Sequence, residues 1–239
     1  MRIITGIYKG RRFDIPRSFK ARPTTDFAKE NIFNVLNSYI DLEGVRALDL
    51  FAGTGSISLE LLSRGCSQVV SIEADRDHAR FIGECVRKLG VTNHQLIRGD
   101  VFRYLKSAQK SFNLERDAAT LPLEHSGEAA LNGRRPLNSD AVAIERGSAA
   151  LNAAQQLLNR GAAAIERPDR GRAFSFIFAD PPYALPNLPD IPDLVLQSGV
   201  LAPGGVFVFE HGKQNDFSSH PNFREHRAYG SVNFTIFTT

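Results

Sequence analysis

The sequence predicts an α/β domain in which a mostly parallel sheet carries helices on both faces. Apolar runs of strand length alternate with helical patterns from residue 45 onward, which is typical of β-α-β units. The first run leads into a glycine turn, Ala52-Gly53-Thr54-Gly55, and acidic residues stand at the ends of later runs. Because ligands bind at the carboxyl ends of parallel strands, these residues predict one binding site at that edge of the sheet.

The first 22 residues predict a basic β-hairpin in front of the domain, which takes up residues 23–239. Two short strands, from Arg2 to Tyr8 and from Arg12 to Ile15, would flank a turn at Lys9-Gly10. This segment holds seven basic residues and one acidic residue, whereas the other 217 residues hold 22 basic and 25 acidic ones. The asymmetry favours a nucleic-acid partner over a merely solubilising terminus. The candidate nucleic-acid-binding residues are Arg2, Lys9, Arg11, Arg12 and Arg22.

A helix is predicted after Arg22-Pro23-Thr24-Thr25-Asp26, because hydroxyl and acidic side chains are favoured at helix N-caps. It would join the basic hairpin to the first strand of the sheet. The apolar face that would pack on the sheet comprises Phe27, Ile32, Phe33, Val35, Leu36, Tyr39 and Ile40.

The glycine turn lies between a buried strand, residues 45–51, and a helix that starts near Ser56. Glycines let the backbone approach a ligand closely, and a helix N-terminus offers free N–H groups. A dinucleotide site would need a third glycine at position 58, which is a serine here. A nicotinamide oxidoreductase is therefore disfavoured.

Two further strands end in acids that suit a nucleoside. The strand from Gln68 leads to Glu73, a position from which a carboxylate can bind both ribose hydroxyls. A helix over residues 75–89 with Gly90 as its stop follows, and the strand from His94 ends at Asp100, where an adenine amine could be held. A third helix begins at Val101.

The apolar run over residues 174–178 breaks into Asp180-Pro181-Pro182-Tyr183. Proline cannot continue a central strand, so the strand ends there in a stiff turn. The turn offers a carboxylate, free carbonyl groups and an aromatic ring, which together suit a planar amine on a base. A plain strand end with a solvated Asp180 and a packed Tyr183 is the structural alternative.

The rest of the chain completes the sheet. We expect a proline-rich loop over the site at residues 185–192, a short helix at 193–198 and a turn at Gly204-Gly205. A buried strand over 206–209 follows, and two last strands, 223–228 and 232–237, form a hairpin.

Residues 107–172 do not fit this alternation. The 66 residues contain one aromatic residue, Phe112, and fourteen alanines, so they lack the apolar bulk for a core of their own. We interpret the segment as a low-complexity insertion, within which residues 148–165 could form one helix. A target-recognition module is the alternative.

Composition limits the remaining possibilities. Cys66 and Cys85 have no metal-type spacing and are expected to be reduced, buried residues. No apolar run reaches the length of a membrane span and no leader follows Met1, so we expect a cytoplasmic protein, by default a monomer, with no membrane contact.

The motifs together resemble S-adenosylmethionine-dependent amino-methyltransferases, and more closely the RsmD type, the bacterial 16S rRNA guanine-N2 methyltransferases. The resemblance covers residues 1 to about 106 and about 173 to 237. The motifs that carry it are Arg2-Ile3-Ile4-Thr5-Gly6, Lys9-Gly10-Arg11-Arg12, Arg22-Pro23-Thr24, Asp49-Leu50-Phe51-Ala52-Gly53-Thr54-Gly55, Glu73, Gly99-Asp100, Asp180-Pro181-Pro182-Tyr183 and Glu210-His211-Gly212-Lys213.

This resemblance implies a Rossmann-like class I methyltransferase fold with seven strands, the last one antiparallel, and S-adenosylmethionine as cofactor without a metal. The cofactor's ribose would lie on Glu73, its adenine near Asp100 and its methionine part near Asp49. The implied cofactor-binding residues are Asp49, Phe51, Ala52, Gly53, Thr54, Gly55, Glu73, Ala74, Asp100 and Val101.

The resemblance also implies the chemistry. Asp180 and the Pro181 carbonyl group would bind the exocyclic amine of a flipped guanine while Tyr183 stacks on its ring, with Pro182 completing the catalytic turn. The partner would be 16S rRNA within a partly assembled small ribosomal subunit. A DNA adenine-N6 methyltransferase can use the same four residues, but it generally needs a sizeable recognition domain. A nucleic-acid-binding module without catalysis is a further alternative, which the intact Asp180 turn disfavours.

Overall fold

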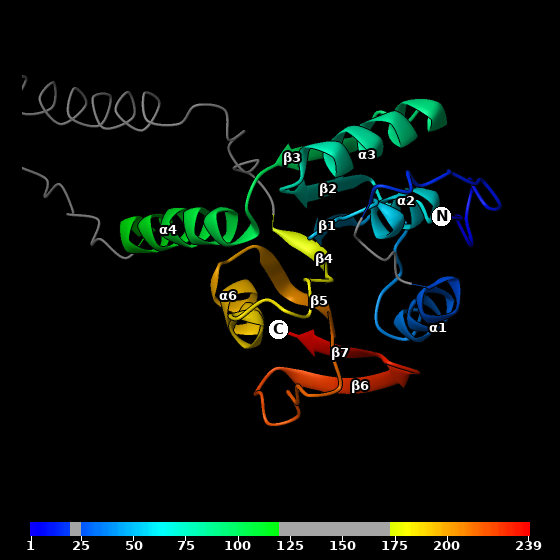
Figure 1. Ribbon diagram of the computed structural model, residues 1–239. Coiled ribbons are helices and arrows are strands. Elements are labelled where there is room, and N and C mark those ends of the chain that lie inside the picture. The colour runs from blue at the N-terminus through cyan, green and yellow to red at the C-terminus, as the bar shows by residue number, and fades with distance from the viewer. Residues whose placement is uncertain (20–24, 120–172) are drawn as a thin grey trace, which may run out of the picture. The chain divides into compact units, whose positions relative to one another are not determined.

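The computed structural model describes residues 1–19, 25–119 and 173–239, and its sheet confirms the predicted fold class. Seven strands lie in the order β3-β2-β1-β4-β5-β7-β6 (Figure 1). Pairing is parallel from β3 through to β5, whereas β7 is antiparallel to both β5 and β6. The strands are β1 (Arg46–Leu50), β2 (Gln68–Glu73), β3 (His94–Arg98), β4 (Phe174–Ala179), β5 (Leu201–His211), β6 (Phe223–Tyr229) and β7 (Val232–Thr238).

Helices cover both faces of the sheet and make two separate cores. One core joins α1, α2 and α3 to one face, and the other joins α4 and α6 to the opposite face. Along β1, Ala47 belongs to the first core, whereas Leu48 and Leu50 belong to the second, because strand side chains alternate in direction. The helices are α1 (Asp26–Leu36), α2 (Ser56–Ser63), α3 (Arg76–Leu89), α4 (Val101–Ala119), the 3-10 helix η1 (Leu188–Asp190) and α6 (Ile191–Gln197).

The strand register brings the predicted site residues to one edge. Leu50, the last residue of β1, pairs with Ile72 of β2 on one side and with Ala179 of β4 on the other. The three central strands therefore end level with one another. The residues that follow them in the chain meet at the carboxyl edge of the sheet.

The predicted start of α1 and the predicted stop of α3 are confirmed. The Thr25 side chain accepts a hydrogen bond from the Ala28 N–H group and caps α1. Asp75 caps α3, and Gly90 ends α3 with a left-handed φ of 71°. The sequence pattern indicated Thr25 and Gly90 at these ends, whereas Asp75 was expected to be the first residue of its helix.

The N-terminal arm, residues 1–19, does not form the two predicted strands. It contains a single antiparallel bridge, between Arg2 and Arg12, with a hydrogen bond of 3.0 Å from the Ile3 N–H to the Arg11 carbonyl group. The backbone groups after Ile3 bind helix α2 instead: the N–H groups of Ile4 and Thr5 donate to the two Glu60 carboxylate oxygens at 2.8 Å and 3.0 Å. The arm is thus ordered by the body of the domain and not by a second strand.

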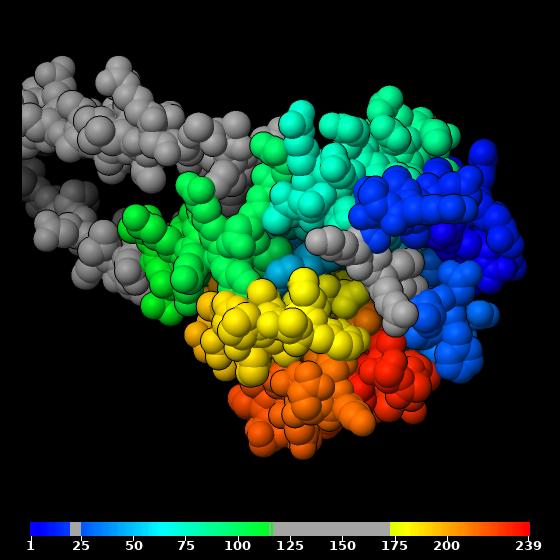
Figure 2. Space-filling view, viewed as in Figure 1, coloured from blue at the N-terminus to red at the C-terminus, as the bar shows by residue number. Residues whose placement is uncertain are grey.

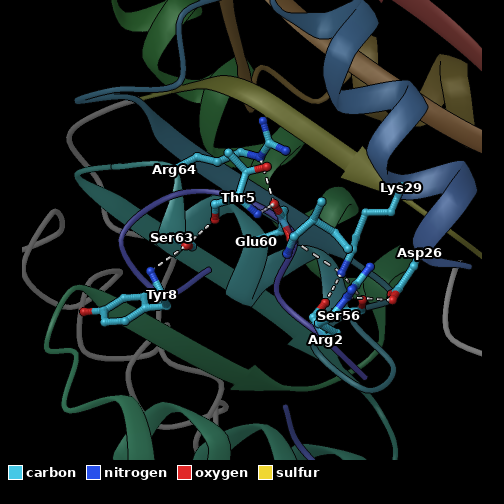
Figure 3. Close-up of polar contacts among 10 residues, drawn as sticks. Arg2, Thr5, Tyr8, Asp26, Lys29, Ser56, Glu60, Ser63 and Arg64 are labelled. Carbon is cyan, nitrogen blue, oxygen red and sulfur yellow. Dashed lines mark hydrogen bonds and ion pairs between the residues drawn. The ribbon is translucent and has the colours of Figure 1, made fainter. Parts of the chain in front are cut away.

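A buried ion pair fastens the arm to the body (Figure 3). Lys29 of α1 and Glu60 of α2 both have an exposed fraction of 0%. The Lys29 Nζ atom donates to the Arg2 carbonyl group at 2.7 Å and to the Ser56 Oγ atom at 3.1 Å, and it lies 3.5 Å from Glu60 Oε2. Burial lowers the pKa of Lys29, and the Glu60 charge opposes that effect.

Several local expectations were wrong. Phe27 was predicted on the buried face of α1 but is 65% exposed, while Lys29 is buried in that face. Residues 185–192 are not one loop, because they contain η1 and the first two residues of α6. The predicted turn at Gly204 lies inside β5, where the pairing with β4 shifts register. Helix α1 ends before Tyr39.

The predicted insertion, residues 107–172, begins inside helix α4. That helix continues to Ala119 as regular structure. The rest of the segment, including the helix expected over residues 148–165, lies outside the described residues. Met1–Arg116 and Arg167–Thr239 form one compact unit, and the second unit, Asp117–Glu166, lies outside the described part except for the end of α4.

Candidate active site

A cavity of about 740 Å³ lies at the carboxyl edge of the sheet. Its walls come from the starts of α1 to α4, the glycine turn, the carboxyl ends of β1 to β5 and the turn between β6 and β7. Of the predicted site residues, those that line it are Asp49, Phe51, Ala52, Gly53, Thr54, Glu73, Ala74, Asp100, Val101, Asp180, Pro181, Pro182 and Tyr183. The two predicted groups of site residues, from distant parts of the chain, thus share one cavity.

Gly55 does not line this cavity and has a packing role. It precedes α2 with a φ of 75°, a conformation that side chains rarely adopt. A β-carbon at this position would lie 2.9 Å from the Ile82 Cγ1 atom of α3. Glycine here lets the start of α2 approach α3 closely.

Glu73 is held by the backbone of the turn it faces. Its Oε2 atom accepts a hydrogen bond of 2.7 Å from the Gly53 N–H group, and its Oε1 atom accepts one of 2.7 Å from the Asp75 N–H group. The His78 Nδ1 atom lies 3.8 Å from Oε1. The carboxylate is therefore fixed in direction at the cavity wall.

Asp49 lies at the back of the cavity and is 2% exposed. Ser58, which occupies the place of a third glycine, donates a hydrogen bond to Asp49 and contacts the Ser71 hydroxyl at 2.6 Å. Ser71 in turn contacts His94 at 2.8 Å. Burial raises the pKa of Asp49 to about 7, and burial lowers the pKa of His94 to about 4. Ser58 is therefore a hydrogen-bond donor to the buried Asp49 carboxyl group, and it does not have the role of the third glycine in a dinucleotide site.

Asp100 has a structural contact as well as a place in the cavity. Its Oδ1 atom accepts a hydrogen bond of 2.8 Å from the Arg103 N–H group, which caps the start of α4. The cap fixes the direction of the carboxylate beside Val101 in the wall.

The four-residue turn after β4 faces a buried acid that sequence reasoning did not include in the site. The Tyr183 hydroxyl donates to the Glu210 Oε1 atom at 3.0 Å, and Glu210 is 4% exposed on β5. Burial raises the pKa of Tyr183, as do the charges of Glu210 and Asp180, so the phenol stays neutral. The bond fixes the Tyr183 ring, which is 40% exposed.

Other cavity residues were also missed. Thr25, Ser56 and His78 line it from three different helices, and Ser231 lines it from the turn between β6 and β7. Glu210 could have been predicted as a site residue, because it is the first residue of the Glu210-His211-Gly212-Lys213 motif. Thr25 belongs to the helix-start pattern at residues 22–26. Ser56, His78 and Ser231 carry no local pattern, because only long-range packing brings them together.

The candidate RNA-binding residues differ in their surroundings. Arg2 is committed to an ion pair, with its Nε atom 3.1 Å from Asp26 Oδ2. Lys9, Arg11 and Arg12 are exposed on the arm. Arg22 lies outside the described residues.

Three smaller expectations concern cysteines, metals and membranes. Cys66 and Cys85 are free and buried as predicted, and burial raises their pKa values to about 12 and about 11. Within residues 1–19, 25–119 and 173–239, no cluster of His, Cys, Asp or Glu is arranged to hold a metal ion. The helices of this described part include none with the length and apolar character of a bilayer span.

A family model covers most of the chain. The model described as conserved hypothetical protein 95 matches residues 1–115 and 138–238. The chain belongs to this family. The match includes residues 107–115 and 138–172, which we had assigned to the insertion outside the family resemblance. The internal gap in the match is residues 116–137 alone.

Curated relatives confirm that the chain resembles the RsmD type. YlbH of Bacillus subtilis, described as a candidate rRNA methyltransferase, is 40% identical over 111 residues, which are 46% of this chain and 59% of the relative. Ribosomal RNA small subunit methyltransferase D of Escherichia coli K12 is 36% identical over 110 residues, which are 46% of this chain and 54% of the relative. The chain thus spans little more than half the length of these relatives.

Solved structures support the fold of this family member. The Escherichia coli protein yhhF, described as a candidate methyltransferase, superposes with a TM-score of 0.64 at 20% identity, covering 100% of this chain and 97% of that protein. The likeness and the strand order together confirm a Rossmann-like class I methyltransferase fold.

Proposed function

We propose that the protein transfers a methyl group from S-adenosylmethionine to the exocyclic N2 amine of a guanine in 16S rRNA, within a partly assembled small ribosomal subunit. The observation that carries the proposal is that Asp180, Tyr183 and Glu73 line one cavity. A turn suited to an amine and an acid suited to ribose hydroxyls would thus face the same space. The RsmD-type relatives supply the substrate class.

The cofactor would lie along the glycine turn. The fixed Glu73 carboxylate would bind the ribose hydroxyls, Asp100 the adenine amine, and Asp49 the methionine ammonium group. A cation beside Asp49 would favour its charged form despite the burial. When bound, the cofactor supplies an electrophilic methyl group.

The target base would enter from the Tyr183 side. Flipping a guanine out of its stack costs a few kcal/mol, less in a loop than in a duplex. The Asp180 carboxylate and the Pro181 carbonyl group would accept hydrogen bonds from the exocyclic amine, which aligns the nitrogen lone pair and stabilises the positive charge that develops on it. The Tyr183 ring, anchored by Glu210, would stack on the base.

No strong base is needed for this transfer. The amine nitrogen would form its bond to the methyl carbon as the bond between that carbon and sulfur breaks, which leaves S-adenosylhomocysteine, and the nitrogen would then lose a proton to solvent. Asp180 therefore acts by position and charge.

The arm would contact the RNA backbone outside the cavity. The exposed cations Lys9, Arg11 and Arg12 are free to bind phosphate groups, whereas Arg2 is already paired with Asp26. Arg22 remains a prediction from sequence. This division means that removal of Lys9 should weaken RNA binding more than removal of Arg2.

Methyl transfer from labelled S-adenosylmethionine tests the proposal. Unmethylated small ribosomal subunits, naked 16S rRNA and double-stranded DNA are offered in parallel, and the labelled nucleoside is identified after digestion. N2-methylguanosine from RNA is the expected product. N6-methyladenine from DNA alone would overturn the proposal in favour of a DNA methyltransferase, and cofactor binding without transfer to any substrate would favour a binding module.

A further inference from the structure

A second cavity, of about 370 Å³, lies between the arm and the last turn of α3. Its charged side chains are Arg11, Arg12, Lys88 and Asp14, and its apolar walls include Phe81. Figure 2 shows the arm, in dark blue, directly beside α3, in teal. Three cations thus face one acid in a hollow that is separate from the active-site cavity.

The three cations are available for a ligand. Arg11, Arg12 and Lys88 are exposed, and within the described ranges none of them forms an ion pair with a carboxylate. Arg80, on the same helix, is by contrast 3.8 Å from Asp77. Because like charges repel, three unpaired cations in one hollow favour an anion between them.

The arm backbone that lines this hollow is held by hydrogen bonds before any ligand binds. The Arg11 carbonyl group accepts a hydrogen bond of 3.0 Å from Ile3, and the Phe13 N–H group donates one of 3.0 Å to the Met1 carbonyl group. Phe13 is buried in the core beneath. Since the backbone on both sides of Arg12 is held, little ordering of the chain is needed when an anion binds.

The hollow is also connected to the active-site cavity along α3. Phe81 lines the hollow and packs against Phe19 with ring centroids 5.5 Å apart. Phe19 in turn lies on His78, with centroids 4.3 Å apart, and His78 lines the active-site cavity. From His78 to Lys88 the helix rises by about 15 Å. That distance is spanned by a few nucleotides of extended RNA.

We propose that this hollow binds a backbone phosphate group of the substrate RNA a few nucleotides from the target, and that Lys88 completes the site with Arg11 and Arg12. The inference rests on the proposed function, which supplies the RNA. The hollow lies at the C-terminal end of α3, where the helix dipole does not attract anions. The affinity must therefore come from the three side chains.

A matched pair of variants tests the assignment. Lys88→Ala and Arg87→Ala each remove one exposed cation from the last turn of α3, but only Lys88 lines the hollow. The dissociation constant of a single-stranded 16S rRNA fragment is measured for each protein over a range of salt concentrations. We expect Lys88→Ala to reduce the slope of log affinity against log salt by about 0.7, the value for one phosphate contact on a single strand, and Arg87→Ala to leave it unchanged.

Two further measurements make the result decisive. Lys88→Arg should restore the slope, and the affinity for S-adenosylhomocysteine should be the same in all four proteins. Equal slopes for Lys88→Ala and Arg87→Ala would overturn this inference alone, provided that the wild-type protein methylates rRNA. If the wild-type protein binds RNA through Lys88 but transfers no methyl group, the proposed function alone is overturned. A wild-type protein that binds no RNA overturns both.

Discussion

The Nζ atom of Lys29 lies 3.5 Å from the Oε2 atom of Glu60, and neither side chain is exposed to solvent. The pair joins three parts of the molecule, because Lys29 also binds the arm at Arg2 and the cavity wall at Ser56, while Glu60 binds the N–H groups of the arm. Lys29 depends on Glu60 for its compensating charge, whereas Glu60 is also paired with Arg64, whose Nε atom lies 3.1 Å from its Oε1 atom. Neither the arm nor the start of α2 can change position without disturbing the pair.

Replacing Lys29 by methionine should destabilise the protein by about 3–5 kcal/mol, because Glu60 would keep a buried charge with less compensation. Urea unfolding monitored by circular dichroism measures the change. Asp26→Asn is the matched control, since it removes a second link from α1 to the arm, the exposed ion pair with Arg2, which should contribute about 1 kcal/mol or less. Equal losses for the two variants would contradict a special role for the buried pair.

Gly6→Ala should detach the arm from α2. A β-carbon at Gly6 would lie 1.8 Å from the Ser63 carbonyl oxygen, whereas a β-carbon at Gly10 would meet no atom within 4 Å. Both glycines have a positive φ, so Gly10→Ala carries the same backbone strain without the clash. We expect RNA affinity to fall clearly further for Gly6→Ala than for Gly10→Ala, with cofactor affinity unchanged in both. Filter binding and calorimetry measure the two affinities.

Asp180→Ala should reduce methyl transfer by about a hundredfold or more, because it removes a group that acts on the developing charge. The affinity for S-adenosylhomocysteine should stay within about threefold of the wild-type value, since the cofactor would be bound mainly by the glycine turn and Glu73. Single-turnover kinetics and calorimetry separate the two effects. Comparable losses in both would contradict the role of Asp180.

Tyr183→Phe and Tyr183→Ala should differ. Phenylalanine keeps the ring and loses the bond to Glu210, so the base can still stack, although the ring is less well fixed. Alanine loses the stacking, which is worth about 1–3 kcal/mol per base, so KM for RNA should rise by about tenfold or more. Steady-state kinetics with rRNA fragments measure both. A phenylalanine variant as impaired as the alanine variant would show that the hydroxyl group, and not the ring, is what matters.

The stability of the protein without cofactor should fall between about pH 4 and pH 7 because of Asp49. Burial raises the pKa of this carboxyl group to about 7, above its ordinary value of 3.8, so the folded state holds a proton that the unfolded state releases. The Asp49 contribution is complete below about pH 4 and is lost as the pH rises through 7. Urea unfolding at several pH values should show this decline in the wild-type protein, and Asp49→Asn should lack this part of it. The same decline in both proteins would assign it to other groups.

Much of the fold could be predicted because its signals are local. The run from Arg46, the glycine turn and the caps at Asp75 and Gly90 each depend on neighbouring residues. The contacts that order the arm are not local: Ile4 binds Glu60, and Tyr8 binds Ser63. A buried lysine such as Lys29 is also invisible in a pattern, because lysine on a helix normally indicates the exposed face.

The site residues that lie at or near the ends of strands could be predicted from the sequence. Glu73 and Asp180 stand where apolar runs stop, and Asp49 lies one residue before the end of β1. Parallel pairing then brings the three acids to one edge. Glu210 lies inside its strand, β5, and faces the cavity only because that strand pairs beside β4. The role of Ser58 as the partner of Asp49 likewise depends on packing between α2 and β1.

The pairing of Leu50 with Ala179 has a consequence for how the molecule is made. β1 and β4 are neighbours in the sheet, yet β4 is translated long after β1, β2 and β3 are complete. A nascent chain that stops short of β4 has an open β1 edge, which is a surface prone to pair with other strands. Contacts between segments so distant in sequence form slowly. Assembly of the active site is thus expected to be a late event in folding, and the nascent half-sheet to be the stage most vulnerable to aggregation.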